Sequence, residues 1–444
     1  MTQTPVVRAA SALPLGLGGL LALLLWLMVG DLGVSMRDRG ALPSALELLR
    51  RHGASDTLTS LLLSTLPALL SVLIVPLAAY HSDHCRSRLG RRKPFLLAAA
   101  PLGGLALMGA AAAPALGPAL HQVLGTWSPG QRFCSLALFG ICWALFDCAA
   151  LCALSLFHGL VNDVVPAQLM GRVFAGIRIV GLGAGIAYQH WVFALTEHQL
   201  PQVLVGVALC FTAPLLVMAW QIREKPLPTP LAEAPRRPPW RFPLAHVLAC
   251  FRYRPFAWGA AAFMLAGATF SPFNTFYLHY AHALGMPKST LGTLTAAGYL
   301  VSIISAFGIG WLVDRFGAAR VSMVVLALYG GVSGLGYAAV SDAADFRIFY
   351  VAHVVISGAW FTAAASLPMA LFPRSSFVQF NSTKDLMTVF AVILVSGAQG
   401  PALDWSGHDY RLTLLAGAVA SALAVACLAR LQAGDMARLV AASR

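Results

Sequence analysis

Charged residues are scarce in this chain. Asp, Glu, Lys and Arg make up 11% of its 444 residues, whereas they make up about 25% of a typical soluble domain. Hydrophobic residues reach 58%, and the mean hydropathy is positive. A chain with so little charge cannot cover the surface of a soluble fold. The composition therefore predicts a polytopic membrane protein that is surrounded by a lipid bilayer.

Carboxylates are scarcer than cations. The chain has 17 Asp and Glu residues against 30 Lys and Arg residues, which gives a formal net charge of +13. A basic chain of this kind can bind nucleic acid, but here the cations lie in short segments between apolar runs and do not line one soluble face. Positive charge retained on the cytoplasmic side of a membrane explains that distribution, so we expect no nucleic-acid partner.

Sequence patterns of metal sites and of hydrolytic enzymes are missing. The eight cysteines include no Cys-x-x-Cys pair and have no histidine at ligand spacing. We find no nucleophile elbow and no paired catalytic carboxylates. We therefore expect no metal, no cofactor and no enzymatic activity.

Long apolar runs recur along the chain. A transmembrane helix needs about 20 predominantly apolar residues, and runs of that kind fall into two sets of six. They cover approximately 13–48, 57–80, 94–117, 133–160, 168–195 and 200–221, then 256–284, 289–313, 318–340, 346–372, 379–402 and 411–432. The pattern predicts an all-α membrane protein with about twelve transmembrane helices in two six-helix bundles.

A segment rich in proline and arginine separates the two sets. Its composition neither spans a membrane nor packs into a core. The expected domains are an N-terminal bundle at 1–221, a cytoplasmic linker at 222–255 and a C-terminal bundle at 256–444.

Basic loops orient the chain. The loops at 81–93, 223–254 and 314–320 are rich in Lys and Arg, which places them and both termini in the cytoplasm. Residues 37–51 are also basic but fall on the outer side in this topology. We expect the plasma membrane, in a bacterium the inner membrane, as the location.

One loop motif is duplicated. Asp83 is followed by Gly90, Arg91, Arg92, Lys93, Pro94 and Phe95, and a degenerate copy runs from Asp314 and Arg315 to Arg320. The pattern resembles the loops after helices two and eight in the major facilitator superfamily. The form Arg88 to Phe95, with the segments 162–166 and 371–380, is similar to the sucrose-type and glycoside-cation symporter branches, and the resemblance covers nearly the whole chain.

The resemblance implies a role for these loops. In the family the motif is a cytoplasmic latch, whose Asp meets a helix N-terminus and whose cations pair with carboxylates of the other bundle when the inner gate is shut. Gate residues by position are Asp83, Gly90, Arg91, Arg92, Asp314 and Arg315. The second loop lacks the cationic cluster, so we expect a weaker latch there. The alternative is that both loops only set the topology.

The first apolar run is the richest in charge. Asp31 and Asp38 lie about two helical turns apart, with Ser35 between them and with Arg37 and Arg39 beside them. Ionisable residues at membrane depth are functional candidates by default. We predict Asp31, with Asp38 as second choice, as the proton-coupling carboxylate, and Arg37 as a substrate ligand. The alternative is that residues 37–39 are a solvated helix end.

Two further spans carry opposite charges. Asp147 lies midway along 133–160 and Arg178 lies near the start of 168–195, so we predict that they pair. Such a pair is either architectural or part of the substrate site; the resemblance to sucrose-type symporters implies the site. Counting from Pro166 and Pro373, Arg178 and Asp385 occupy equivalent places in the two halves. Arg178 and the pair Lys384 and Asp385 are therefore expected to face each other across a central cavity.

Aromatic and amide groups gather in the run 256–284. Sugars stack their ring faces on aromatic rings and need convergent donors and acceptors for their hydroxyl groups. We predict Asn274, Tyr277 and Trp360 as sugar ligands, whereas helix packing is the alternative for each.

These observations predict a monomeric secondary transporter that works by alternating access. The resemblance implies proton-coupled symport of a sugar or glycoside; sodium is less favoured because 58–80 has no carboxylate, whereas sodium-coupled relatives use carboxylates there. The alternative is a proton-driven exporter of drugs or metabolites.

Overall fold

The computed structural model describes residues 17–83, 85, 87–165, 169–222, 224, 250–251, 254–372 and 377–442. Within these residues the chain is helical, apart from turns and one isolated bridge between Ser87 and Gly90. Most of the expected linker, the side chain of Asp83, and the reference prolines Pro166 and Pro373 lie outside the described residues.

The helices of the first half follow the predicted runs. They are α1 (Leu17–Met36), α2 (Leu42–Arg51), α3 (Asp56–Ser60), α4 (Leu66–Asp83), α5 (Lys93–Leu124), α6 (Gln131–Val164), α7 (Met170–Ala187) and α8 (Thr196–Gln221). A π turn at Arg37–Ala41 joins α1 to α2, and another at Leu61–Thr65 joins α3 to α4, so each pair forms one continuous span. Such turns are frequent at functional sites.

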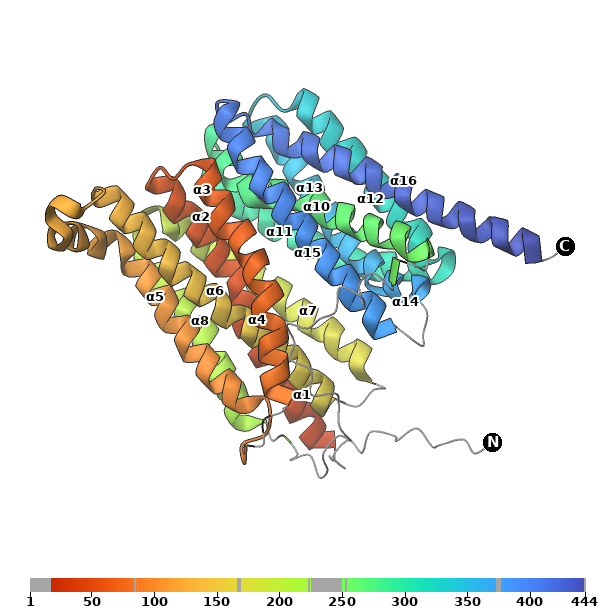
Figure 1. Cartoon of the computed structure of the whole chain (residues 1–444), viewed down its shortest axis with the longest axis horizontal. Helices are drawn as coiled ribbons and strands as arrows, with labels where there is room; N and C mark the ends of the chain where they lie inside the picture. Colours follow the sequence, from red (N-terminus) through yellow and green to blue (C-terminus); the bar gives the residue numbers. More distant parts are fainter. Residues whose placement is uncertain are drawn as a thin grey trace.

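The second half has the same character. Its helices are α10 (Arg254–Ala283), α11 (Lys288–Phe316), α12 (Ala318–Ala339), α13 (Ala343–Ala363), α14 (Leu367–Leu371), α15 (Phe377–Trp405) and α16 (Arg411–Ala442). Figure 1 shows α1 to α8 gathered on one side and α10 to α16 on the other, with α7 beside α11. The proposed domain limits stay predictions, because the linker is largely outside the described residues.

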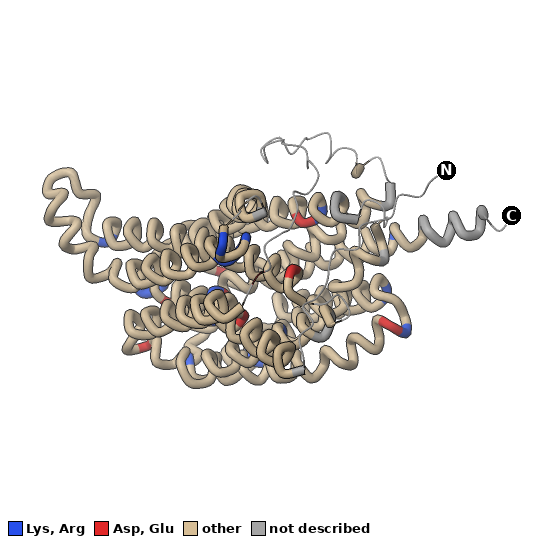
Figure 2. The backbone as a smooth tube through the Cα atoms, turned by 90° about the horizontal axis from the view of Figure 1, so that it is seen from below, with Lys and Arg blue, Asp and Glu red and all other residues tan. Residues whose placement is uncertain are grey.

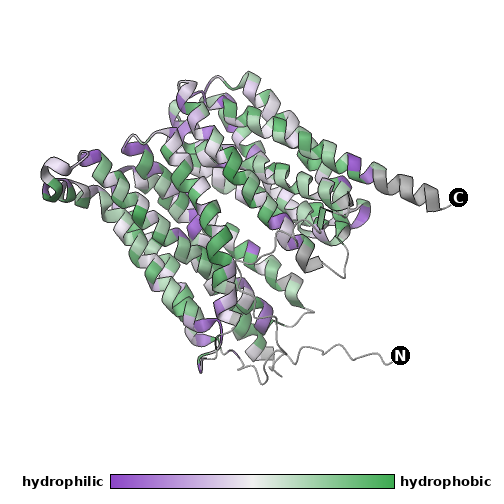
Figure 3. Cartoon of the chain, in the orientation of Figure 1, coloured by the Kyte–Doolittle hydropathy of each residue, from purple (hydrophilic) through white to green (hydrophobic). Residues whose placement is uncertain are grey.

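The described residues contain 11 helices that are long and apolar enough to cross a membrane. One of them, Val173–Gln221, has 49 residues and covers most of α7 and all of α8, which is enough for two crossings of about 20 residues each. Few charges interrupt the helices (Figure 2), and apolar residues run along their length (Figure 3). The chain is therefore an all-α, multi-pass integral membrane protein, as the sequence predicted.

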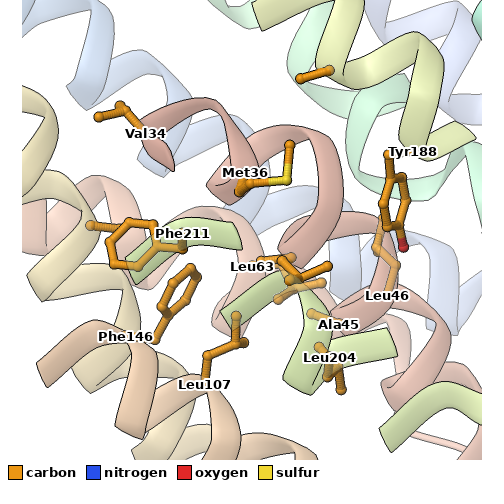
Figure 4. Close-up of a cluster of buried hydrophobic side chains, with 14 of the residues drawn as sticks. Val34, Met36, Ala45, Leu46, Leu63, Leu107, Phe146, Tyr188, Leu204 and Phe211 are labelled. Carbon is orange, nitrogen blue, oxygen red and sulfur yellow. The ribbon is translucent and has the colours of Figure 1, made fainter. Parts of the chain in front are cut away.

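Close helix packing positions the first span. Figure 4 shows Phe146 of α6 and Phe211 of α8 in the core that supports α1 and α2. Gly33 faces α8 so closely that an added Cβ would lie 2.7 Å from the backbone oxygen of Phe211. Small residues permit such an approach between membrane helices. The π turn at Arg37–Ala41 is thereby held against a rigid wall.

Candidate functional site

A cavity of about 520 Å³ lies between the two halves of the chain. Its wall comes from the π turn after α1 and from α2, α7, α10, α11 and α13. A second cavity of about 260 Å³ shares Leu42, Asn274 and Phe361 with it. The two cavities are therefore adjacent. The polar residues of the larger one are Asp38, Arg39, Arg178, Gln189, Asn274, Tyr277, Tyr299, Ser302, Tyr350, His353 and Ser357.

Arg37 joins two carboxylates next to this cavity. Its Nε and Nη2 atoms each lie 2.7 Å from Oδ1 of Asp147, and its Nη1 lies 2.6 Å from Oδ1 of Asp38. Asp147 is fully buried, whereas the Asp38 side chain is 59% exposed towards the cavity. A fixed guanidinium thus links a core carboxylate to a cavity carboxylate.

The predicted pair between Asp147 and Arg178 is wrong. Arg178 points to the other half, where its Nη2 donates to the backbone oxygen of Gly358 at 3.0 Å. Asp147 has Arg37 as its ionic partner because α6 packs against α1. Arg178 lines the larger cavity, whereas Asp147 does not and is linked to the cavity residue Asp38 through Arg37.

Arg39 covers an aromatic wall of the cavity. Its guanidinium lies 4.6 Å from the ring centroid of Tyr299 on α11, within the range of a cation–π contact. Gly185 of α7 permits this approach, since a Cβ there would lie 3.0 Å from Cδ of Arg39. Arg39 and Arg178 therefore each connect the two halves beside the cavity.

Asp31 and Asp38 lie in different environments. Asp31 is buried, accepts a hydrogen bond from Ser35 at 3.2 Å and faces Gly181 of α7. Asp38 lies in the π turn and reaches the cavity. Residues 37–39 do not end a helix, because the helical segment continues to Arg51, so this part of the alternative is wrong.

The predicted aromatic and amide ligands each line at least one of the two cavities, and their role as sugar ligands stays a prediction. Asn274 is exposed to the cavity and lines both compartments. Tyr277 lines the larger one and stacks on Tyr350 with ring centroids 5.7 Å apart. Trp360 lines the smaller one, next to Phe270 at 6.4 Å.

Lys384 and Asp385 do not line either of these cavities. Their side chains form an ion pair with each other at 2.6 Å, and the Lys384 ammonium lies 4.8 Å from the ring centroid of Phe263. The expectation that they face Arg178 is therefore wrong.

One end of the cavity is closed by contacts between the halves. We call it the closed end and define it by residues 47–57, 282–288 and 404–410. The carboxylate of Asp404 accepts hydrogen bonds from the backbone N–H groups of Asp56 and Thr57, each at 2.9 Å. These donors are free at the start of any helix, so Asp404 of the second half caps α3 of the first.

Asp56 completes this arrangement. Its two oxygens are bonded to Nδ1 of His408 at 2.7 Å and to the hydroxyl of Tyr410 at 3.2 Å. The hydrogen bond to Asp56 raises the pKa of His408. Asp56, Asp404 and His408 are also close enough to act as metal ligands. The carboxylate oxygens of Asp56 and Asp404 already accept hydrogen bonds from this chain. We therefore interpret these contacts as a latch between the two halves.

A second ion cluster closes the same end. Glu47 is fully buried and lies 2.6 Å from Nζ of Lys288 in the other half and from Nε of Arg51. Nη2 of Arg50 is 2.8 Å from the same carboxylate. Three cations, from both halves of the chain, therefore surround one buried carboxylate at the closed end.

The duplicated motif lies at the opposite end. Gly90 has a φ of 110°, and a Cβ there would collide with Glu224. The Glu224 carboxylate accepts hydrogen bonds from the backbone N–H groups of Arg91 at 2.6 Å and of Lys93 at 3.1 Å, and so caps α5. Arg91 also pairs with Asp163.

The other predicted gate residues have different surroundings. Arg92 lies 2.9 Å from Asp163, within the same half of the chain. Arg315 lies 5.3 Å from the ring centroid of Trp311, at the end of α11, and Asp314 beside it is exposed. The latch role remains a prediction for all of them.

Several cavity residues escaped the sequence analysis. Gln189, Tyr299, Tyr350 and His353 all line the larger cavity. Each is an uncharged or weakly basic residue in an apolar run, where membrane-interface anchors and packing residues have the same composition. The one available signal was polarity within a span.

The chain is similar to known transporters. A family model described as MFS/sugar transport protein matches residues 50–376, whereas no curated protein matches the chain. A mutant of the nucleoside transporter NupG superposes with a TM-score of 0.71 at 16% identity, covering 92% of this chain and 99% of that one. The inward-open xylose transporter XylE from E. coli gives 0.64 at 15% identity, covering 90% and 94%. An inward-facing bacterial homologue of ferroportin gives 0.62 at 14% identity, covering 93% and 99%.

Proposed function

Because the chain belongs to the MFS/sugar transport family and is therefore a transporter, we propose that it carries a sugar or glycoside together with a proton, by alternating access. The observation that carries this proposal is the central cavity, whose wall combines amide, hydroxyl, guanidinium and aromatic groups. Sugars need all of these, because their hydroxyl groups both donate and accept hydrogen bonds and their ring faces are apolar.

The lining favours a polar substrate over a drug-like one. Asp38, Arg39 and Arg178 present formal charges to the cavity, and Asn274 presents an amide. A hydrophobic compound would displace water from these groups without offering hydrogen bonds in return, which costs about 1–3 kcal/mol for each polar group left unsatisfied. The structure of a D-xylose-proton symporter has a similar fold, which supports the proposal at the level of architecture.

The closed end supports alternating access. Asp404 caps α3, and Lys288 pairs with Glu47, so two sets of contacts must break before the halves can separate there. We propose that this end faces outwards and that the basic motif loop faces the cytoplasm. The protein then occupies an inward-facing state.

Asp31 is the proposed proton carrier. It is buried against Gly181 of α7, which lies one helical turn after Arg178, and its only described hydrogen bond comes from Ser35. A buried carboxylate with few donors favours its neutral form. Movement of α7 relative to α1 during rocking would change that environment and release the proton.

Two measurements test the substrate class. Thermal shifts of the purified protein with mono- and disaccharides, nucleosides and hydrophobic cations identify what binds, and counterflow in proteoliposomes shows whether the bound compound is transported. Sugar-specific stabilisation and counterflow are expected. Stabilisation by hydrophobic cations alone would replace this proposal with the exporter.

A further inference from the structure

A hydrogen-bonded relay runs from α12 through α13 to the cavity. The hydroxyl of Tyr329 on α12 lies 2.8 Å from Nδ1 of His353 on α13, and Nε2 of His353 lies 2.9 Å from Oδ1 of Asn274 on α10. Tyr329 is 1% exposed and His353 4% exposed, whereas Asn274 is exposed to the cavity. Tyr329 and His353, which are both buried, thus hold the side-chain carbonyl oxygen of Asn274.

Neighbouring rings fix the relay in place. Phe273 lies 4.4 Å from the imidazole of His353, and Phe270 lies 4.5 Å from the ring of Tyr329, both between centroids. An imidazole packed in this way cannot turn over without displacing aromatic side chains. Its two nitrogen atoms therefore keep different partners.

The chemistry of the partners gives the relay a direction. The Asn274 carbonyl oxygen only accepts, so Nε2 of His353 must carry the proton. In a neutral imidazole Nδ1 then has a free lone pair, and the Tyr329 hydroxyl donates to it. Hydrogen bonds that point the same way along a chain strengthen one another.

From this geometry we infer that Tyr329 and His353 are positioning residues that turn the Asn274 amide so that its NH₂ group faces the substrate as a donor. The site then selects ligands with an acceptor oxygen at this point, as in a sugar hydroxyl or ring oxygen, and disfavours analogues that lack it. The inference rests on the proposed function for the identity of the ligand. The orientation of the amide does not depend on it.

The orientation is tested by nitrogen-15 NMR of the histidine-labelled protein at neutral pH. The variant His353→Gln identifies the His353 signals by their loss. The expected spectrum shows a neutral ring with its proton on Nε2, and Tyr329→Phe shifts the Nδ1 signal of this ring alone. A proton on Nδ1, or a doubly protonated ring, would overturn the inference. If His353→Gln does not fold, the shift in Tyr329→Phe makes the assignment.

Binding supplies a second, separate readout with D-glucose, D-xylose and sucrose as probes. Asn274→Asp keeps the shape and an acceptor oxygen but loses the donors, so it should weaken the tightest of the three by about tenfold. Tyr329→Phe should weaken it less. Tyr188→Phe is the control, because it removes a buried hydroxyl bonded to Ser44 at 2.7 Å and should leave affinity unchanged. Native affinity in Asn274→Asp would refute the donor role.

Failure of the proposed substrate class and failure of the inferred Asn274 orientation give different results. If the native protein binds none of these sugars, the proposed substrate class fails, while the tautomer of His353 still decides the orientation of Asn274.

Discussion

The contact between Arg37 and Asp147 gives the most quantitative prediction. Asp147 is fully buried and both of its described ionic contacts come from Arg37, whereas Arg37 also reaches the exposed Asp38 at 2.6 Å. Removing one partner of a buried pair typically costs about 3–5 kcal/mol. Because Arg37 keeps Asp38, we expect Asp147→Asn to lower the free energy of unfolding by about 3 kcal/mol, near the lower limit of that range.

A double-mutant cycle isolates the pair. Arg37→Gln combined with Asp147→Asn removes both charges, so the double variant should be less destabilised than the sum of the single variants by about 2 kcal/mol. Unfolding would be followed in mixed micelles by denaturant titration. Asp409→Asn is the control, since its pair with Arg411 is solvent-exposed and should contribute little. Additive single effects would refute the coupling of these two residues.

Three further predictions address coupling and the two ends of the transporter. Asp31→Asn should abolish uphill, pH-driven uptake but preserve substrate exchange; equal loss of both activities in a folded variant would remove Asp31 from coupling. The hydrogen bond to Asp56 raises the pKa of His408, so protonation of His408 stabilises the contacts of the closed end. This stabilisation is complete below the ordinary histidine pKa of about 6.5 and is lost as the pH rises through the raised pKa. Cysteine labelling at the closed end should therefore increase with pH in the native protein but not in His408→Gln, and an identical profile in both would contradict the latch. Gly90→Ala should lower thermal stability because φ is positive there and the methyl group meets Glu224; unchanged melting would show that the loop adapts.

The helical spans were predictable from composition, and the partners of buried charges were not. Hydropathy placed the spans because each has to cross about 30 Å of hydrocarbon, and the predicted run 133–160 lies within α6. The partner of Asp147 depends on how α6 packs against α1, which no local spacing encodes. The sequence therefore singled out Asp147 as a charge within a span but assigned it the wrong arginine.

Two other features needed the three-dimensional structure. Asp31 is buried against α7, whereas Asp38 lies in the π turn and reaches the cavity, so their separation of two turns did not place them in one environment. The sequence did not indicate that Asp404 is a latch residue, because this carboxylate binds the N-terminus of a helix that lies almost 350 positions earlier in the chain. His353 looked like one of many polar residues in an apolar run until its two nitrogen atoms were seen to have different partners.

Uptake of labelled sugar into proteoliposomes with an imposed pH gradient tests the central claim most directly. The sugar would be one that stabilises the purified protein, and a protonophore would collapse the gradient in a parallel sample. Proton-coupled symport predicts accumulation above the external concentration when the lumen is alkaline, and loss of that accumulation with the protonophore. Equilibration that ignores the gradient, or accumulation only when the lumen is acidic, would contradict it.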